Sequence, residues 1–210
     1  MQQQLAWERQ PDDRQWLKPE GDDPRTLYQM LMTSVERFAE NPCFGFIPEK
    51  GMPRVHMTYR EFGELATSVG KQLRDVGVEA GDRVAMILNN SVEWAAISYG
   101  ANAIGAAYTA MYTHQHGSEW AFILDDSTPS MIAVSDTEVF DKLVENMPAD
   151  AAKWPKCGIL LLGNEPANQL PPEGVQVHDW TSFVANGRAS EAAIEIADDP
   201  FALNTLIYTS

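Results

Sequence analysis

Apolar side chains change their spacing along the chain, and the change predicts where helices give way to strands. After a polar stretch at residues 1–23, apolar residues recur every three or four positions as far as residue 38, which is the spacing of an amphipathic helix. Asp23-Pro24 supplies an N-cap and a first-turn proline, and Asn41-Pro42 stops the helical pattern. We therefore expect an irregular or wrapping arm over residues 1–23, followed by the first helix.

The next segment predicts a β-hairpin and a second helix. Two short apolar runs, Phe44–Ile47 and Arg54–Met57, flank a turn rich in proline and glycine, as hairpin strands do. Thr58 and Glu61 then form a T-x-x-E capping box, which is typical of a helix start. The apolar face that follows ends at Gly77, so the helix should end there as well.

Beyond residue 80, short continuous apolar runs alternate with segments of helical periodicity. The runs predict strands at Arg83–Leu88, Ala107–Met111, Met131–Ser135, Gly158–Leu162 and Val175–His178. Ser91 and Ser118 are the expected N-caps of two intervening helices, and residues 186–200 are expected to be a surface connection before a last strand. This alternation requires crossover connections, so the predicted fold is α/β: a mostly parallel sheet with helices on both faces, in which the first three strands are neighbours.

Composition and charge argue against some classes of function, among them nucleic-acid binding. Among 210 residues, 44% are hydrophobic and 21% charged, as in an ordinary globular domain, and the formal net charge is −15. Such an acidic chain lacks the basic surface that nucleic-acid binding needs. It holds no apolar run near the ~20 residues of a transmembrane helix, and residues 1–5 do not read as a signal peptide. Cys43 and Cys157 are widely separated, which indicates two structural thiols and a cytoplasmic location.

Candidate chemistry in the interior of the chain is weak. Gly100 and Gly105 have the spacing of a phosphate loop but lack its lysine, so a helix end built from small residues is the expectation. His114 and His116 lack a third ligand of suitable spacing, and we interpret them as a polar loop at the carboxyl end of a strand, where α/β sheets bind ligands. The acidic pair Asp125-Asp126 is expected to be a solvated cap or turn at the end of an element.

The end of the chain carries a stronger signal. Tyr208-Thr209-Ser210 follows an apolar run and resembles the opening of the phosphate-binding loop of adenylate-forming enzymes, Y-T-S-G-T-T-G-x-P-K-G. Other segments resemble the acyl-CoA synthetases of this family in the same order: Thr58–Phe62 (T-Y-x-E-L), Gly77–Ala85 (G-V-x-x-G-D-R-V-A), Asn90–Trp94 (N-S-x-E-W), Gly105–Thr113 (G-A…P-L-Y-T) and Leu124–Ser127 (L-x-D-S). Together they identify the chain as similar to the N-terminal part of a long-chain fatty acid–CoA ligase.

The resemblance implies an activity for the parent enzyme. Such enzymes use Mg²⁺-ATP to turn a carboxylic acid into an acyl-adenylate, and then transfer the acyl group to coenzyme A. It also implies that residues 24–210 are an incomplete N-terminal AMP-binding domain, truncated at the start of the ATP phosphate loop. Only Thr209 and Ser210 correspond to that loop, and none of the family's catalytic or metal-binding residues corresponds to a position here.

Three further expectations follow from this resemblance. The substrate should be a fatty acid, and the chain alone should be inactive. It should also self-associate or be only marginally stable, because apolar surface that the whole enzyme buries would be exposed. Two alternatives stay open at this point: an adenylate-forming enzyme that activates aryl acids or amino acids, and a stand-alone α/β binding module without catalysis.

Overall fold

The computed structural model describes residues 26–47, 51–191 and 193–209. Its first helix, α1 (Leu27–Phe38), begins later than expected, because Thr26 is the N-cap and forms a capping box with Gln29. The expected arm over residues 1–23 and the expected cap at Asp23 lie outside the described residues.

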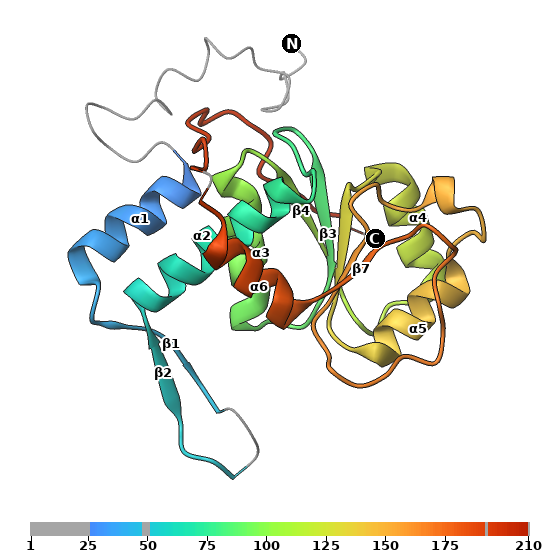
Figure 1. The fold of residues 1–210 in the computed structure, drawn as a ribbon, viewed down its shortest axis with the longest axis horizontal. Coiled ribbons are helices and arrows are strands. Elements are labelled where there is room, and N and C mark those ends of the chain that lie inside the picture. Colours follow the sequence, from blue (N-terminus) through green and yellow to red (C-terminus); the bar gives the residue numbers. More distant parts are fainter. Residues whose placement is uncertain (1–25, 48–50, 192, 210) are drawn as a thin grey trace, which may run out of the picture.

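The predicted hairpin and second helix are confirmed. Strands β1 (Pro42–Phe46) and β2 (Val55–Thr58) pair antiparallel and project away from the rest of the domain (Figure 1). Helix α2 (Tyr59–Asp75) begins with the predicted capping box, in which the Thr58 hydroxyl accepts from the Glu61 backbone and the Glu61 carboxylate accepts from the Thr58 backbone. Gly77 then turns the chain with a φ of +100°.

The centre of the domain is a six-stranded parallel sheet with the strand order β7-β6-β5-β3-β4-β8. Its strands are β3 (Arg83–Ile87), β4 (Ala107–Met111), β5 (Met131–Val134), β6 (Ile159–Leu161), β7 (Val177–Asp179) and β8 (Thr205–Leu206). The three strands predicted as neighbours are adjacent, with β3 between β4 and β5, so that Met86 lies opposite both Ala110 and Ala133.

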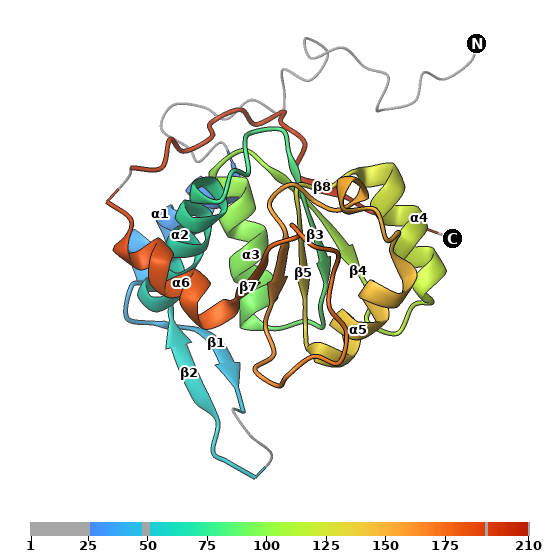
Figure 2. The ribbon, with the colours of Figure 1, turned by 45° about the vertical axis from the view of Figure 1, so that its right-hand side comes forward.

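Helices cover both faces of this sheet, as Figure 2 shows. The helices after α2 are α3 (Val92–Ala103), α4 (Gly117–Ser127), α5 (Thr137–Asn146), the short 3-10 turn η3 (Ala151–Lys153) and α6 (Trp180–Ala189). Val84 and Met86 point into the core under α2, α3 and α6, whereas Ala85 and Ile87 point into the core under α4 and α5. The alternation along β3 therefore builds two apolar cores, and the α/β fold is confirmed.

One helix start was predicted wrongly, and one helix was missed. Helix α4 begins with His116 as the N-cap, and Ser118 lies inside its first turn. Helix α6 was not predicted, and its last residues fall in the expected connection over residues 186–200. Its N-cap is Asp179, which accepts from the Ser182 backbone. The buried face of α6 has helical spacing, but poor helix formers such as Gly187 obscure it.

Within the described ranges, the structure holds no helix that is both long and apolar enough to cross a membrane.

Candidate functional site at the carboxyl edge of the sheet

The central strands β3, β4 and β5 end at one edge of the sheet, and polar residues follow each of them. Asn89 comes after β3, Thr113 after β4 and Ser135 after β5. The Thr113 hydroxyl donates to the Asn89 side-chain oxygen over 3.1 Å, so the first two loops are joined. Open α/β sheets bind ligands beyond the carboxyl ends of their strands, which makes this edge the candidate site.

A cavity of about 480 Å³ opens at this edge, beside β4. Its walls come from the end of β3, the start of α3, β4 and the segment that contains β8. They comprise Leu88, Asn89, Asn90, Trp94, Tyr108, Ala110, Met111, Tyr112 and residues 205–208. Trp94 and Tyr108 meet edge to face with their ring centroids 5.7 Å apart, which gives the cavity an aromatic wall. Such a mixture of apolar walls and a few amides is typical of small-molecule sites.

The segment that leads to Thr209 runs along the edge of this cavity. Strand β8 pairs only through Thr205 opposite Tyr108 and Leu206 opposite Thr109, so the ladder ends before Met111, the last residue of β4. Thr209 is exposed, and Ser210 lies outside the described residues. The structure therefore describes one of the two hydroxyl residues proposed for the phosphate loop.

Tyr208 anchors this segment to α4. Its ring packs against the core under α4 and α5, and its hydroxyl donates to the Asp126 carboxylate over 2.5 Å. Partial burial raises the pKa of Tyr208, and the hydrogen bond to Asp126 raises it further, so the hydroxyl remains a proton donor at neutral pH. Asp126 is exposed in the last turn of α4, as expected of a solvated residue at the end of an element. Its contact with Tyr208 joins positions far apart in the sequence, which no local pattern reveals.

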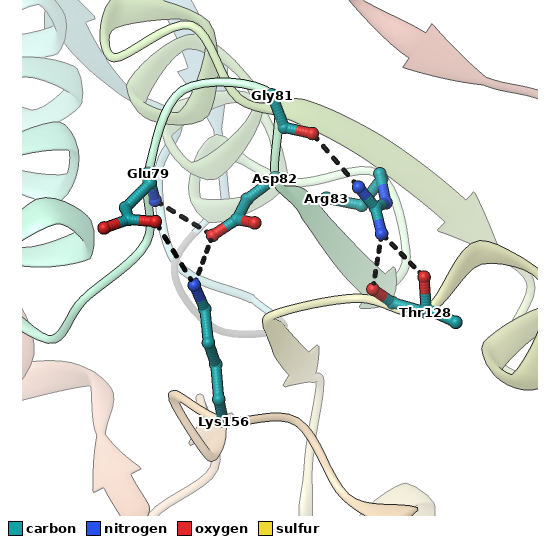
Figure 3. A network of polar contacts seen from close by, with 6 residues as sticks. All are labelled: Glu79, Gly81, Asp82, Arg83, Thr128 and Lys156. Carbon is teal, nitrogen blue, oxygen red and sulfur yellow. Dashed lines mark hydrogen bonds and ion pairs between the residues drawn. The ribbon is translucent and has the colours of Figure 1, made fainter.

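The Gly81-Asp82-Arg83 stretch of the family resemblance lies near the start of β3, and none of these residues lines the cavity. Figure 3 shows its contacts. The Arg83 guanidinium donates to the backbone oxygens of Ser127 (2.7 Å) and Thr128 (2.9 Å), at the end of α4. Asp82 accepts from Lys156 over 3.0 Å and from the Glu79 backbone over 3.0 Å. These contacts join three connections of the fold, so this part of the resemblance has a structural role.

The weaker sequence candidates lie elsewhere in the fold. His116 is the N-cap of α4, and His114 is exposed in the loop after β4. The part of the chain that the structure describes shows no group of three His, Cys, Asp or Glu side chains that could hold a metal ion. Gly100 lies where α3 crosses α2, and a Cβ atom there would be 2.9 Å from the Gly70 backbone nitrogen. Gly105 turns the chain after α3 with a φ of +76°. Neither glycine lies in a phosphate loop.

The strand order, the two helical layers and the cavity at the carboxyl edge define a doubly wound α/β domain with a ligand-binding edge. The family model described as "AMP-binding enzyme" matches residues 31–210 of the chain. The chain belongs to this family of AMP-binding enzymes.

Individual relatives agree with this assignment. The long-chain-fatty-acid–CoA ligase FadD13 of Mycobacterium tuberculosis is 37% identical over 171 residues, covering 69% of this chain and 34% of that protein. Long chain acyl-CoA synthetase 5 of Arabidopsis thaliana is 23% identical over 194 residues, covering 90% of this chain and 29% of that protein. The chain therefore spans about a third of the length of these curated relatives.

Solved structures share the fold. The N-terminal domain of FACL13 from Mycobacterium tuberculosis aligns with a TM-score of 0.63 at 26% identity, covering 88% of this chain and 42% of that chain. The adenylation domain of a carboxylate reductase from Mycobacterium chelonae aligns with a TM-score of 0.71 at 20% identity, covering 92% of this chain and 33% of that chain. The expected likeness to N-terminal domains of acyl-CoA synthetases is thus confirmed at the level of the fold.

Proposed function

We propose that this chain acts as the N-terminal part of an acyl-CoA synthetase. That enzyme activates a fatty acid with ATP to an acyl-adenylate and then transfers the acyl group to coenzyme A. The observation that carries the proposal is the 37% identity to a long-chain-fatty-acid–CoA ligase over 171 residues. Because the chain covers 34% of that relative, the activity belongs to a longer polypeptide in this proposal.

The proposed role of this chain is to bring the start of the ATP phosphate loop to the cavity. Thr209 follows the segment along the cavity edge, and its hydroxyl and backbone N–H are groups that bind phosphate oxygens. Ser210 has the same proposed role. Magnesium, when bound, neutralises charge on the phosphates. The proposal assigns the metal and coenzyme A to the longer ligase that contains this chain.

Four further properties belong to this proposal. Residues 24–210 form an incomplete AMP-binding domain after an arm at residues 1–23, and the enzyme works in the cytoplasm. The chain alone is inactive, because adenylation needs the carboxylate, the α-phosphate and the metal held together, and loss of one preorganised donor already costs about 10²–10³ in rate. The chain alone also self-associates through its exposed apolar side chains, among them Ile207, which is 77% exposed.

The test is ATP–pyrophosphate exchange with fatty acids of increasing length, an aryl acid and an amino acid. It should be run on the ligase that contains this chain and on the 210-residue chain. We expect exchange from the ligase alone, strongest with long fatty acids. Exchange with only the aryl acid or only the amino acid would replace the fatty-acid proposal with another adenylate-forming enzyme. No exchange with any acid would favour a binding module.

A further inference from the structure

Strand β8 is too short to fix the chain that follows it. It is a two-residue edge strand, paired to β4 on one side, and its ladder ends at Leu206. Within residues 207–209 the backbone continues without strand pairing, and Ile207 is 77% exposed. Side-chain contacts must therefore determine where the hydroxyl of Thr209 lies.

Two such contacts hold the segment, one at each end. At its start, the Asn204 side-chain amide donates to the side-chain oxygen of Asn102, which is 7% exposed in the last turn of α3. Asn102 in turn donates to the Ala106 backbone oxygen over 3.3 Å. At its end, the Tyr208 hydroxyl donates to Asp126 of α4 over 2.5 Å. Since α3 and α4 cover opposite faces of the sheet, the segment is held from both sides.

The hydrogen bond between Tyr208 and Asp126 is the contact adjacent to the proposed phosphate loop. Its acceptor, Asp126, lies on a helix end that hydrogen bonds from Arg83 hold in place. Asp126 lies in the last turn of α4, and Arg83 at the start of β3 donates to the backbone oxygen of the next residue, Ser127, over 2.7 Å. The same guanidinium donates to the hydroxyl of Thr128 over 2.6 Å (Figure 3). The end of α4 is therefore fixed to the central strand, and the exposed Asp126 carboxylate has a fixed place beside Tyr208.

We propose that Tyr208 and Asp126 are positioning residues for the phosphate loop: their hydrogen bond holds the chain against α4 so that Thr209 enters the loop from a fixed point. This inference rests on the proposed function. The residue after Tyr208 has little freedom once the tyrosine ring and hydroxyl are both held. A reacting group displaced by about 1 Å can lose about 10²-fold in rate, so this placement affects catalysis without contact to substrate.

The first experiment measures the placement itself in the 210-residue chain, by nuclear magnetic relaxation of the Ile207 and Tyr208 amides at a concentration where sedimentation shows a monomer. We expect order parameters near those of rigid backbone, about 0.85, in the wild type. In Tyr208→Phe, which keeps the ring and its packing, they should fall below about 0.6. Asp125→Asn is the matched control, because it changes the exposed carboxylate beside Asp126. Unchanged order in Tyr208→Phe would overturn the proposal.

The second experiment measures the consequence in the ligase that contains this chain. Tyr208→Phe and Asp126→Ala should each lower kcat/KM for ATP by roughly 10-fold to 100-fold. The thermal midpoint should stay near that of the wild type. The double variant should lose no more than either single variant, because both remove one interaction. Asp126→Asn keeps an oxygen acceptor and should recover part of the loss.

The outcomes separate this inference from the proposed function. A wild-type ligase without exchange activity refutes the proposed function, and the relaxation measurement still decides whether Tyr208 and Asp126 hold the segment. An active ligase whose Tyr208→Phe variant keeps the wild-type kcat/KM for ATP overturns the positioning role and leaves the proposed function standing.

Discussion

Helix α6 crosses helix α2 at Gly187, and this contact supports a quantitative prediction. Gly187 is buried, and a Cβ atom built there would lie 1.9 Å from the backbone oxygen of Ser68 and 2.7 Å from its carbonyl carbon. Even a close carbon–oxygen contact is about 3.3 Å. Gly187→Ala therefore forces α6 away from α2 by more than about 1 Å, and Phe183 and Val184 on the same helix lose part of their packing.

Two opposing energies decide the sign of the change. Replacing glycine by alanine within a helix gains about 1 kcal/mol of intrinsic helix stability. Overpacking a core costs about 1–3 kcal/mol. The obstacle here is the backbone of another helix, which cannot rotate aside as a side chain can, so we take the upper value. The net expectation is a loss of about 2 kcal/mol in the free energy of unfolding.

Urea unfolding followed by circular dichroism measures this loss, and the thermal midpoint should fall by roughly 4–8 °C. Asn186→Ala is the matched control, because it changes an exposed residue next to Gly187 on α6 and should stay within about 0.5 kcal/mol of the wild type. If Gly187→Ala were as stable as the wild type while the control behaved as expected, the close packing of α6 on α2 would be refuted.

Three further predictions concern the connections at the starts of the strands. Arg83→Met should lower the free energy of unfolding by about 2 kcal/mol in urea, because two backbone oxygens at the end of α4 lose a charged donor. Although partial burial raises the pKa of Asp82, hydrogen bonds from the Glu79 backbone and Lys156 hold it below its usual value. Its stabilising effect is therefore present at neutral pH and lost as the pH falls through that lowered pKa, so Asp82→Asn should flatten the loss of stability measured below about pH 4. Gly158→Ala should cost more than about 2 kcal/mol, because φ is +80° and a Cβ atom would lie 2.3 Å from the Gln176 backbone oxygen; Gly174→Ala, with a φ of +96° and open space, should cost about 1 kcal/mol in the same assay.

Local signals explain which parts of the fold the sequence could predict. The capping box of Thr58 and Glu61 determines the start of α2 through contacts between residues three apart, so the pattern is visible in the sequence. The apolar runs of β3 and β5 are buried on both faces of the sheet, which makes them continuous and distinguishes them from the helices. Their neighbouring order then follows from the rules for crossover connections.

Tertiary contacts explain what the sequence could not predict. Gly187 weakens the helical signal of α6, yet it leaves room for the close approach to α2, and intrinsic propensity does not record such a contact. The pattern favoured Ser118 as the N-cap of α4, because serine is a preferred N-cap residue, but the helix begins two residues earlier with His116 as the N-cap. The Tyr208–Asp126 bond joins residues that only the folded sheet brings together.

The central claim is that Thr209 and Ser210 begin the phosphate loop of an acyl-adenylating ligase. The most direct measurement is a single turnover of the ligase that contains this chain, with ATP, Mg²⁺ and a long-chain fatty acid, followed by mass spectrometry with coenzyme A omitted and then added. We predict that acyl-adenylate accumulates without coenzyme A and is converted to the acyl thioester when coenzyme A is added. The absence of acyl-adenylate, or its formation by the 210-residue chain alone, would contradict the account.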